Sequence, residues 1–394
     1  MEYDVVVVGA GPGGSSTAKY CAAAGLDTLL VEKRKEIGAP KRCGEGLTVG
    51  GMKRVGLKPE PEWARQKIMG AIMFSPSLKR VDIEYKPYGG YVIERKIFDK
   101  RLAELAAENG AKVQAGVRAT GLIKNGNQVT GVKLSGYDGV WDVKAKVVVA
   151  ADGVESLVGR WAGLNTKHLL QDTCSGAQFE MCNIDPISED QLEVYMGNEI
   201  APGGYIWIFP KGKHVANVGI GTRGTNGSAL YYLKKFIQSK DNLKKGSILE
   251  INTGNIPVGG PVDQLSTDGL VLVGDAAHQV NAVHGGGIPE SMRAGEIASK
   301  TIKRAIDAND YTRNTLKQYD EEWFAIEGKR LKRVAIMKSV IEKLSDKDLD
   351  YLAEHLSGDQ ILDITRASQF TLLAKIFGKR PSLLKHVPKL LTAV

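Results

Sequence analysis

The clearest hydrophobic pattern in the chain is an uninterrupted run of β-branched residues near its start. Residues 3–8 carry no charge after Asp4 and end in four valines, which is typical of a short buried strand. A glycine-rich turn follows, then a helical segment over residues 15–24, and residues 28–32 repeat the strand pattern. Because parallel strands need a crossover connection, this stretch predicts a βαβ unit.

The pattern changes several times farther along the chain. Buried-strand runs return at residues 147–151, before Asp152-Gly153, and at 270–273, before Gly274-Asp275. Between them, residues 174–222 alternate with period two, which predicts a second, mostly antiparallel sheet. From residue 311 onward the chain is helical in pattern and rich in basic residues. The predicted fold class is therefore α/β with two sheets and a helical C-terminal region.

The turn after the first strand carries the motif G-x-G-x-x-G, from Gly9 to Gly14. Its place between a strand and a helix makes it a dinucleotide-binding signal rather than a chance match. Gly11 lets the backbone approach a pyrophosphate, and the helix N-terminus offers free N–H groups to it. Glu32, at the end of the next strand, can accept hydrogen bonds from ribose hydroxyls and disfavours a 2′-phosphate.

Three buried strands end in ligand-type sequences: the glycine motif from Gly9 to Gly14, Asp152-Gly153 and Gly274-Asp275. This order resembles that of the glutathione-reductase-like flavoproteins of the aromatic-hydroxylase type. That resemblance implies FAD as the cofactor, with Asp275 at the ribityl chain, Arg95 opening a helix beside it, and the backbone of Ala119 at the adenine. A helix start near Pro289 would place positive potential at the flavin pyrimidine. The nearby His278 and His284 are interpreted as structural. The predicted cofactor-binding residues are Gly9, Gly11, Gly13, Gly14, Glu32, Lys33, Arg42, Cys43, Gly44, Gly46, Arg95, Ala119, Asp152, Asp275, Gly286, Gly287 and Ile288.

The same features give a division of the chain. We expect a FAD-binding Rossmann domain from residues 1–165 and 263–310, interrupted by a substrate domain over residues 166–262. A basic helical region would occupy residues 311–394.

Two further stretches resemble the geranylgeranyl reductase family. One is Y-x-W-x-F-P from Tyr205 to Pro210, followed after eight residues by Gly219-Ile220-Gly221. The other is Cys43-Gly44-Glu45-Gly46, similar to a cysteine–glycine loop that those reductases place near the flavin. With the FAD motifs, the resemblance extends to about residue 298. It implies a reductase that saturates isoprenoid chains of ether glycerophospholipids. The predicted substrate-binding residues are Tyr205, Trp207, Phe209, Pro210, Gly219 and Gly221.

Such a reaction delivers a hydride to one alkene carbon and a proton to the other. The hydride would come from N5 of reduced FAD, and the proton donor must lie beside the substrate. Cys43 and Glu45 are the candidate catalytic residues, with bound water or another group as the alternative.

The charge of the chain adds a prediction about partners. The net charge is +8, and residues 361–394 hold six Lys or Arg residues against a single acidic one. This suits an anionic lipid headgroup or leaflet, and residues 372–377 and 383–387 mix apolar and basic residues as interfacial helices do. No nucleic-acid-binding motif accompanies the charge. With no spanning-length apolar run and no secretory signal, we expect a cytoplasmic protein that is peripheral on the inner membrane face.

The remaining observations limit the alternatives. The four cysteines show no C-x-x-C spacing, so no metal centre is predicted. A FAD-dependent aromatic-type monooxygenase shares the cofactor frame but leaves the Y-x-W-x-F-P strand unexplained. A quinone-linked flavoprotein dehydrogenase usually needs a cysteine cluster, which this chain does not have. A last alternative is a membrane-bound binding module that uses FAD only structurally. The sequence does not choose between ferredoxin, NADH and NADPH as the reductant.

Overall fold

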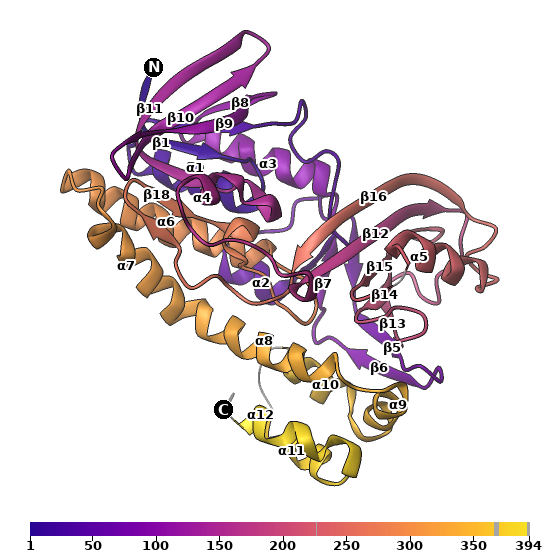
Figure 1. Ribbon diagram of the computed structural model, residues 1–394. Coiled ribbons are helices and arrows are strands. Elements are labelled where there is room, and N and C mark those ends of the chain that lie inside the picture. The colour runs from indigo at the N-terminus through magenta and orange to yellow at the C-terminus, as the bar shows by residue number, and fades with distance from the viewer. Residues whose placement is uncertain (226, 366–369, 392–394) are drawn as a thin grey trace.

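A computed structural model describes residues 1–225, 227–365 and 370–391. Figure 1 shows two sheets side by side, with the C-terminal helices running beneath both of them. The first sheet belongs to the part of the chain that holds the glycine-rich turn. Most strands of the second belong to the predicted substrate domain.

The first sheet has eight strands, and its central path runs β17-β18-β11-β1-β2-β8. The pairs from β18 to β8 along this path are parallel, and β9 and β10 extend it as an antiparallel meander against β11. Val5, Val6 and Val7 are completely buried, as a strand covered on both faces requires. The bounds are β1 (Glu2–Val8), β2 (Thr28–Glu32), β8 (Lys112–Ala115), β9 (Arg118–Asn125), β10 (Gln128–Gly136), β11 (Gly139–Ala150), β17 (Ser266–Thr267) and β18 (Leu270–Leu272).

Helices α1 (Pro12–Ala23), α3 (Arg95–Glu108) and α6 (Ile288–Asp307) pack beside this sheet, with α1 in contact with both others. Helix α1 begins three residues before the predicted start. Pro12 has a fixed φ suited to a first helical turn and lacks the N–H that would have no partner there. The short helix α4 (Leu157–Trp161) follows β11.

The second sheet has seven strands in the order β16-β12-β15-β14-β13-β5-β6. Only the pair of β13 and β5 is parallel. Helix α5 (Ala229–Gln238) packs its apolar face against β12 and β15, where Phe179 and Leu233 are fully buried. The bounds are β5 (Gly70–Phe74), β6 (Arg80–Glu84), β12 (Thr173–Cys182), β13 (Gln191–Met196), β14 (Tyr205–Gly212), β15 (Val215–Thr222) and β16 (Ser247–Pro257).

The inclusion of β5 and β6 differs from the expected division, which placed residues 70–84 in the first domain. Strand β13 would otherwise present an unpaired edge, and β5 supplies its missing hydrogen-bond partners. Val81 and Ile83 alternate with exposed residues along β6, so one face of this hairpin is buried. A small third sheet joins the two domains, from β3 (Gly46–Thr48), β4 (Gln66–Ile68) and β7 (Gly90–Val92), with α2 (Val49–Arg54) after β3.

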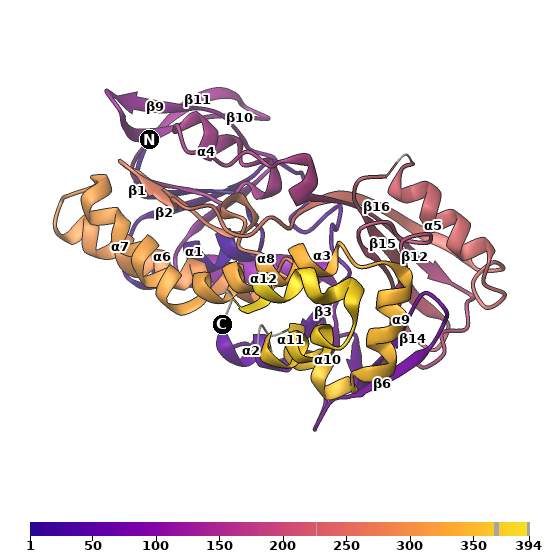
Figure 2. The same ribbon diagram turned by 60° about the horizontal axis from the view of Figure 1, so that its bottom comes forward.

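The C-terminal region is helical, as predicted. A long rod of α7 (Arg313–Trp323), a π-helical turn (Phe324–Gly328) and α8 (Lys329–Ile341) crosses from the first sheet to the second (Figure 1). Figure 2 shows that the remaining helices fold back, so that α10 packs on β6 and α12 lies beside α8. They are α9 (Asp346–His355), α10 (Gly358–Thr365), α11 (Phe370–Gly378) and α12 (Val387–Leu391).

The two segments expected to lie on a membrane face inward instead. Leu373, Phe377 and Leu383 are at most 3% exposed and belong to one apolar cluster with Val81 and Ile83 of β6. Most apolar residues of this region therefore fill the interior of the protein, whereas Leu384 is 50% exposed. Of the helices that the structure describes, none combines the length and the apolar character that crossing a membrane requires.

Candidate active site

A single cavity of about 1670 Å³ runs between the two sheets and the C-terminal helices. Every residue that sequence analysis assigned to the cofactor lies on its wall. Sites for one small molecule usually measure about 300–1,000 Å³. This cavity therefore has room for a dinucleotide and for a second long ligand.

The glycine-rich turn forms one end of the cavity and shows why glycine is needed there. A side chain on Gly14 would place its Cβ 1.9 Å from the carbonyl oxygen of Gly9, so only glycine lets α1 pack this closely on β1. The corresponding position on Gly11 has no protein atom within 4 Å. The space over the start of α1 is thus open for a phosphate group.

Two carboxylates flank this end. Glu32 accepts hydrogen bonds from the backbone N–H of Ala10 and of Arg34, each at 3.0 Å. Asp152 accepts from the Val158 N–H at 3.0 Å through one oxygen, while its other oxygen is buried without a partner. An unpartnered buried acceptor is costly unless a ligand donor reaches it. Together with the open turn, this arrangement fits the nucleotide half of FAD.

Lys33 and Arg42 line the same part of the cavity and both form ion pairs with Glu155. The Lys33 nitrogen lies 2.6 Å from one carboxylate oxygen, and an Arg42 nitrogen lies 3.9 Å from the other. Ala119 of β9 also lines the cavity.

The other end of the predicted cofactor site forms around Asp275. The Gly274-Asp275 motif lies against the glycine loop that precedes α6. A Cβ placed on Gly287 would be 3.6 Å from a carboxylate oxygen of Asp275. Burial raises the pKa of Asp275, and the positive charge of Arg95 opposes that effect. Arg95 itself forms a two-pronged ion pair with Asp99, at 2.9 and 2.8 Å. The structure thus places Arg95, Asp275, Gly286, Gly287 and Ile288 at one end of the cavity.

The two histidines of this region contact backbone groups. His278 Nε2 lies 3.3 Å from the Thr166 carbonyl oxygen, and burial lowers the pKa of His278 to about 4. His284 Nδ1 accepts the Gly286 N–H at 3.1 Å. These contacts hold the surrounding loops, and of the two histidines His284 lines the cavity whereas His278 does not.

The Cys43 loop crosses the middle of the cavity. The half-buried Cys43 sulfur accepts the Glu45 N–H at 3.2 Å, and the charged group of Arg95 interacts with it. Sequence analysis predicts that Gly44 and Gly46 of this loop contact the cofactor. In the structure a Cβ on either glycine would stand 3.1–3.2 Å from the ring of Phe209. The two glycines therefore allow the aromatic strand to pack on the loop.

The aromatic strand β14 packs against this loop and forms the adjoining wall of the cavity. Tyr205, Trp207 and Phe209 all line the cavity, as does Gly221 on β15, whereas Pro210 and Gly219 lie outside it. A Cβ on Gly219 would come 2.3 Å from the Trp207 ring, so this glycine makes room for the indole.

Trp207 in turn donates to the Gln178 side chain at 2.9 Å, and Gln178 donates to the Cys43 carbonyl at 3.0 Å. The strand and the loop are thereby linked through a buried amide.

An apolar channel continues from the Cys43 loop, and sequence analysis did not predict it. One wall is the face of the second sheet formed by alternate residues of β5, β6 and β13. The other wall is formed by α8, α9, α10 and α11. The channel residues include Ala71, Met73, Val81, Ile83, Leu192, Val194, Ile341, Leu344, Leu352, Leu356, Ile364, Leu373 and Phe377. The alternation of apolar and polar residues over positions 80–84 could have predicted a strand with one apolar face, which forms part of one wall. The sequence did not indicate which helices cover that face.

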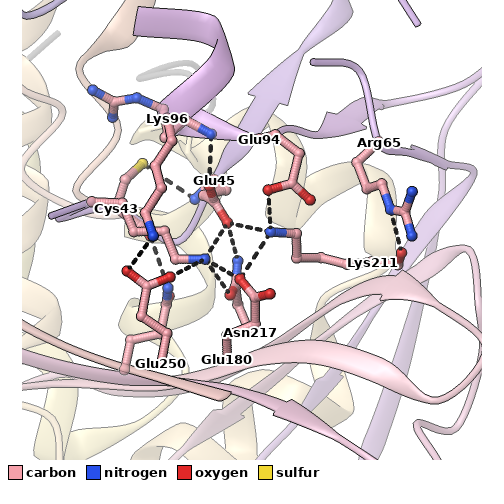
Figure 3. A network of polar contacts seen from close by, with 12 residues as sticks. Cys43, Glu45, Arg65, Glu94, Lys96, Glu180, Lys211, Asn217 and Glu250 are labelled. Atoms are coloured by element: carbon pink, nitrogen blue, oxygen red, sulfur yellow. Dashed lines mark hydrogen bonds and ion pairs between the residues drawn. The ribbon is translucent and has the colours of Figure 1, made fainter. Parts of the chain in front are cut away.

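A buried ionic cluster beneath the loop was also not predicted. Glu45, Glu94 and Glu180 bring carboxylate oxygens within 4.8 Å of one another, a spacing that could hold a metal ion. The ammonium of Lys211 donates hydrogen bonds to Glu45 at 3.0 Å, to Glu94 at 2.7 Å and to Glu180 at 3.0 Å (Figure 3). It therefore occupies the position between the carboxylates that a metal ion would otherwise take. Lys211 directly follows the Y-x-W-x-F-P motif, which was the signal that could have located it.

The comparisons with known proteins agree with this geometry. Residues 172–256 match the model of the geranylgeranyl reductase catalytic domain, and residues 7–42 match that of an NAD(P)-binding Rossmann-like domain. A digeranylgeranylglycerophospholipid reductase of Methanocaldococcus jannaschii is 45% identical over 393 residues, covering 99% of this chain and 98% of that one.

Solved structures extend the likeness to the fold. The crystal structure of a geranylgeranyl bacteriochlorophyll reductase-like protein from Thermoplasma acidophilum has a TM-score of 0.90 and 37% identity, covering 99% of both chains. A flavin-dependent brominase, with a TM-score of 0.73 and 17% identity over 93% of this chain and 94% of that one, shares the fold alone.

A Rossmann-like nucleotide site that opens onto an apolar channel beside a Y-x-W-x-F-P strand defines a reductase of the geranylgeranyl reductase class, an oxidoreductase with a flavoprotein fold. Within that class, the chain belongs to the digeranylgeranylglycerophospholipid reductase family.

Proposed function

We propose that this protein is a FAD-dependent reductase that saturates the double bonds of geranylgeranyl chains in ether glycerophospholipids. The observation that carries the proposal is that the nucleotide cleft and the apolar channel belong to one cavity, which the Cys43 loop also lines. A channel walled by aliphatic side chains suits a long isoprenoid chain, whose burial contributes about 0.8 kcal/mol per methylene group. The family of the chain supports the same substrate.

The residues around the Cys43 loop suit the chemistry that this substrate needs. When bound, reduced FAD supplies a hydride to one carbon of the alkene. The other carbon needs a proton, and the Cys43 thiol is the proton-bearing group on the loop that lines the cavity. The rings of Trp207 and Phe209 pack on the neighbouring glycines of this loop. A site from which water is expelled when the substrate binds would favour transfer of the thiol proton to the alkene.

A competition experiment tests the substrate class. The purified protein is incubated with equal amounts of a digeranylgeranylglycerophospholipid and an isoprenoid quinone, passed through a gel-filtration column, and its retained ligands are identified by mass spectrometry. We expect the phospholipid to be retained in excess. Retention of the quinone instead would favour the quinone-linked dehydrogenase reading.

Replacing Glu32 with alanine tests the proposed cofactor site. Loss of hydrogen bonds to a charged acceptor costs about 1.5–3 kcal/mol, so the dissociation constant for FAD should rise about 10- to 150-fold. Flavin fluorescence titration of the apoprotein measures this change. The melting temperature of the apoprotein is the control, because Glu32 also accepts two backbone N–H groups. A parent protein that takes up no FAD would contradict the proposal.

The site of action that we propose is the inner face of the cell membrane, reached from the cytoplasm. Most apolar residues of α10–α12 pack within the protein. We therefore propose that electrostatic attraction, from a net charge of +8, attaches the protein to the membrane. Each Lys or Arg near an anionic leaflet contributes about 1 kcal/mol. We expect co-sedimentation with phosphatidylglycerol vesicles that is lost at high salt. Equal binding to phosphatidylcholine vesicles would contradict an electrostatic attachment.

A further inference from the structure

The Glu45 carboxylate is the centre of a fully enclosed set of contacts beneath the Cys43 loop. Its side chain has no exposed surface. One oxygen accepts the backbone N–H of Arg95 at 2.7 Å, and the other accepts from Lys41 at 3.1 Å, Lys211 at 3.0 Å and Asn217 at 2.7 Å. Figure 3 shows Glu45 between Lys211, Asn217 and the helix above them. Glu45, Lys41, Lys211 and Asn217 are called the loop anchor below.

The two lysines of the loop anchor are held by further carboxylates. Their side chains are only 2% and 1% exposed, and a buried ammonium is tolerated only where it is paired. Glu180 contacts both of them, and Glu94 lies 2.7 Å from Lys211. Burial alone lowers the pKa of Lys211, but the surrounding carboxylates outweigh it and raise that pKa. The loop anchor is therefore a buried set of polar groups in which each lysine is paired with carboxylates.

This unit fixes the backbone that carries Cys43. Glu45 has a φ of +73°, a left-handed conformation that non-glycine residues adopt only where neighbouring contacts impose it. Its carbonyl accepts the Ile93 N–H at 2.8 Å, and Asn217 donates to the Gly44 carbonyl at 3.3 Å. In that conformation the Glu45 N–H points at the Cys43 sulfur, at 3.2 Å.

We infer that the loop anchor positions the Cys43 thiol, and that Glu45 acts on the reaction only through this loop. This inference rests on the proposed role of Cys43 as the proton-bearing group. Each contact of the Glu45 carboxylate is with a donor, so it acts as an acceptor throughout. Although residue 45 forms part of the cavity wall, its side chain has no exposed surface and all its acceptor positions described above are occupied. Glu45 is thus a positioning residue rather than the alternative proton donor.

The test compares Glu45→Gln with Asp320→Asn, a matched change in a buried carboxylate of α7. Asp320 also accepts from a backbone N–H, a hydroxyl and an arginine, but it contacts Leu265, Ser266 and Arg313 rather than the Cys43 loop. Two quantities are measured: the rate of Cys43 alkylation by iodoacetamide in the apoprotein against pH, by peptide mass spectrometry, and kcat and KM for the lipid. Lys211→Met and its conservative partner Lys211→Arg form a second pair.

We expect Glu45→Gln and Lys211→Met to change the rate and pH profile of Cys43 alkylation and to lower kcat about 100-fold, the usual effect of an ångström-scale misplacement. KM should stay near the parent value, Lys211→Arg should restore part of kcat, and Asp320→Asn should change neither quantity. If Glu45→Gln lost turnover while Cys43 alkylation stayed unchanged, Glu45 itself would be the proton donor and the inference would be wrong. The inference would also be wrong if both the alkylation rate and kcat of Glu45→Gln matched the parent protein. If Cys43→Ala kept the parent rate, the proposed role of Cys43 would fail instead, while the alkylation data would still report on the loop anchor.

Discussion

Replacing Cys43 with alanine should lower the rate of lipid alkene reduction at least about 100-fold, the lower end of what general-acid assistance contributes. The substitution removes the proton-bearing group from the loop that lines the cavity, while the nucleotide end of the cavity is untouched. FAD binding and the reduction of bound FAD by dithionite should therefore match the parent protein. Single-turnover mixing of reduced protein with lipid measures the step directly.

Cys43→Ser is the companion variant. It keeps the shape of the side chain but supplies a weaker acid, so its rate should lie at or above that of Cys43→Ala and well below that of the parent. If Cys43→Ala reduces the lipid at the parent rate, the thiol is a packing residue. Bound water would then become the leading donor, because Glu45 is enclosed by the loop anchor.

The channel between the second sheet and the C-terminal helices gives the second large prediction. Ala71 on β5 is 4% exposed and packs in the same apolar cluster as Ile83 and Phe377. Ala71 lines the channel, so Ala71→Phe would place an aromatic ring in the space proposed for the isoprenoid chain. If about four carbons of an isoprenoid chain are displaced, the loss at about 0.8 kcal/mol each corresponds to a fall in kcat/KM of about 200-fold.

The control for this variant is the length of the substrate. A short isoprenoid alkene that reaches only as far as the Cys43 loop should be reduced by Ala71→Phe at close to the parent rate. An equal loss for short and long substrates would mean that the variant is misfolded or that the chain lies elsewhere. FAD content and melting temperature separate those two explanations.

The nucleotide half of the site could be predicted from sequence because its determinants are local. A strand, a glycine turn and a helix lie within the first 32 residues, and Gly14 is required by a contact with Gly9, five positions away. The distant Asp152 and Asp275 were found because each follows a buried strand of one parallel sheet. Strands of such a sheet end at the same edge, where ligands bind.

The channel and the loop anchor depend on contacts between distant parts of the chain. Residues 70–84 join the second sheet through β13, more than a hundred positions later, and their face is covered by the C-terminal helices from α8 onward. Lys41 and Lys211 are ordinary charged residues in the sequence, and only the fold shows them buried against Glu45. The apolar residues of segments 372–377 and 383–387 suggested a lipid surface because periodicity does not distinguish a membrane from a neighbouring sheet.

The central claim is that this protein reduces isoprenoid double bonds without oxygen. Dithionite-reduced protein is mixed anaerobically with a digeranylgeranylglycerophospholipid, and the flavin absorbance and the lipid mass are followed together. We expect the flavin to reoxidise in the absence of oxygen while the lipid gains about two mass units per flavin, the mass of one hydride and one proton. Reoxidation that requires oxygen and adds about sixteen mass units would contradict the account and select the monooxygenase reading.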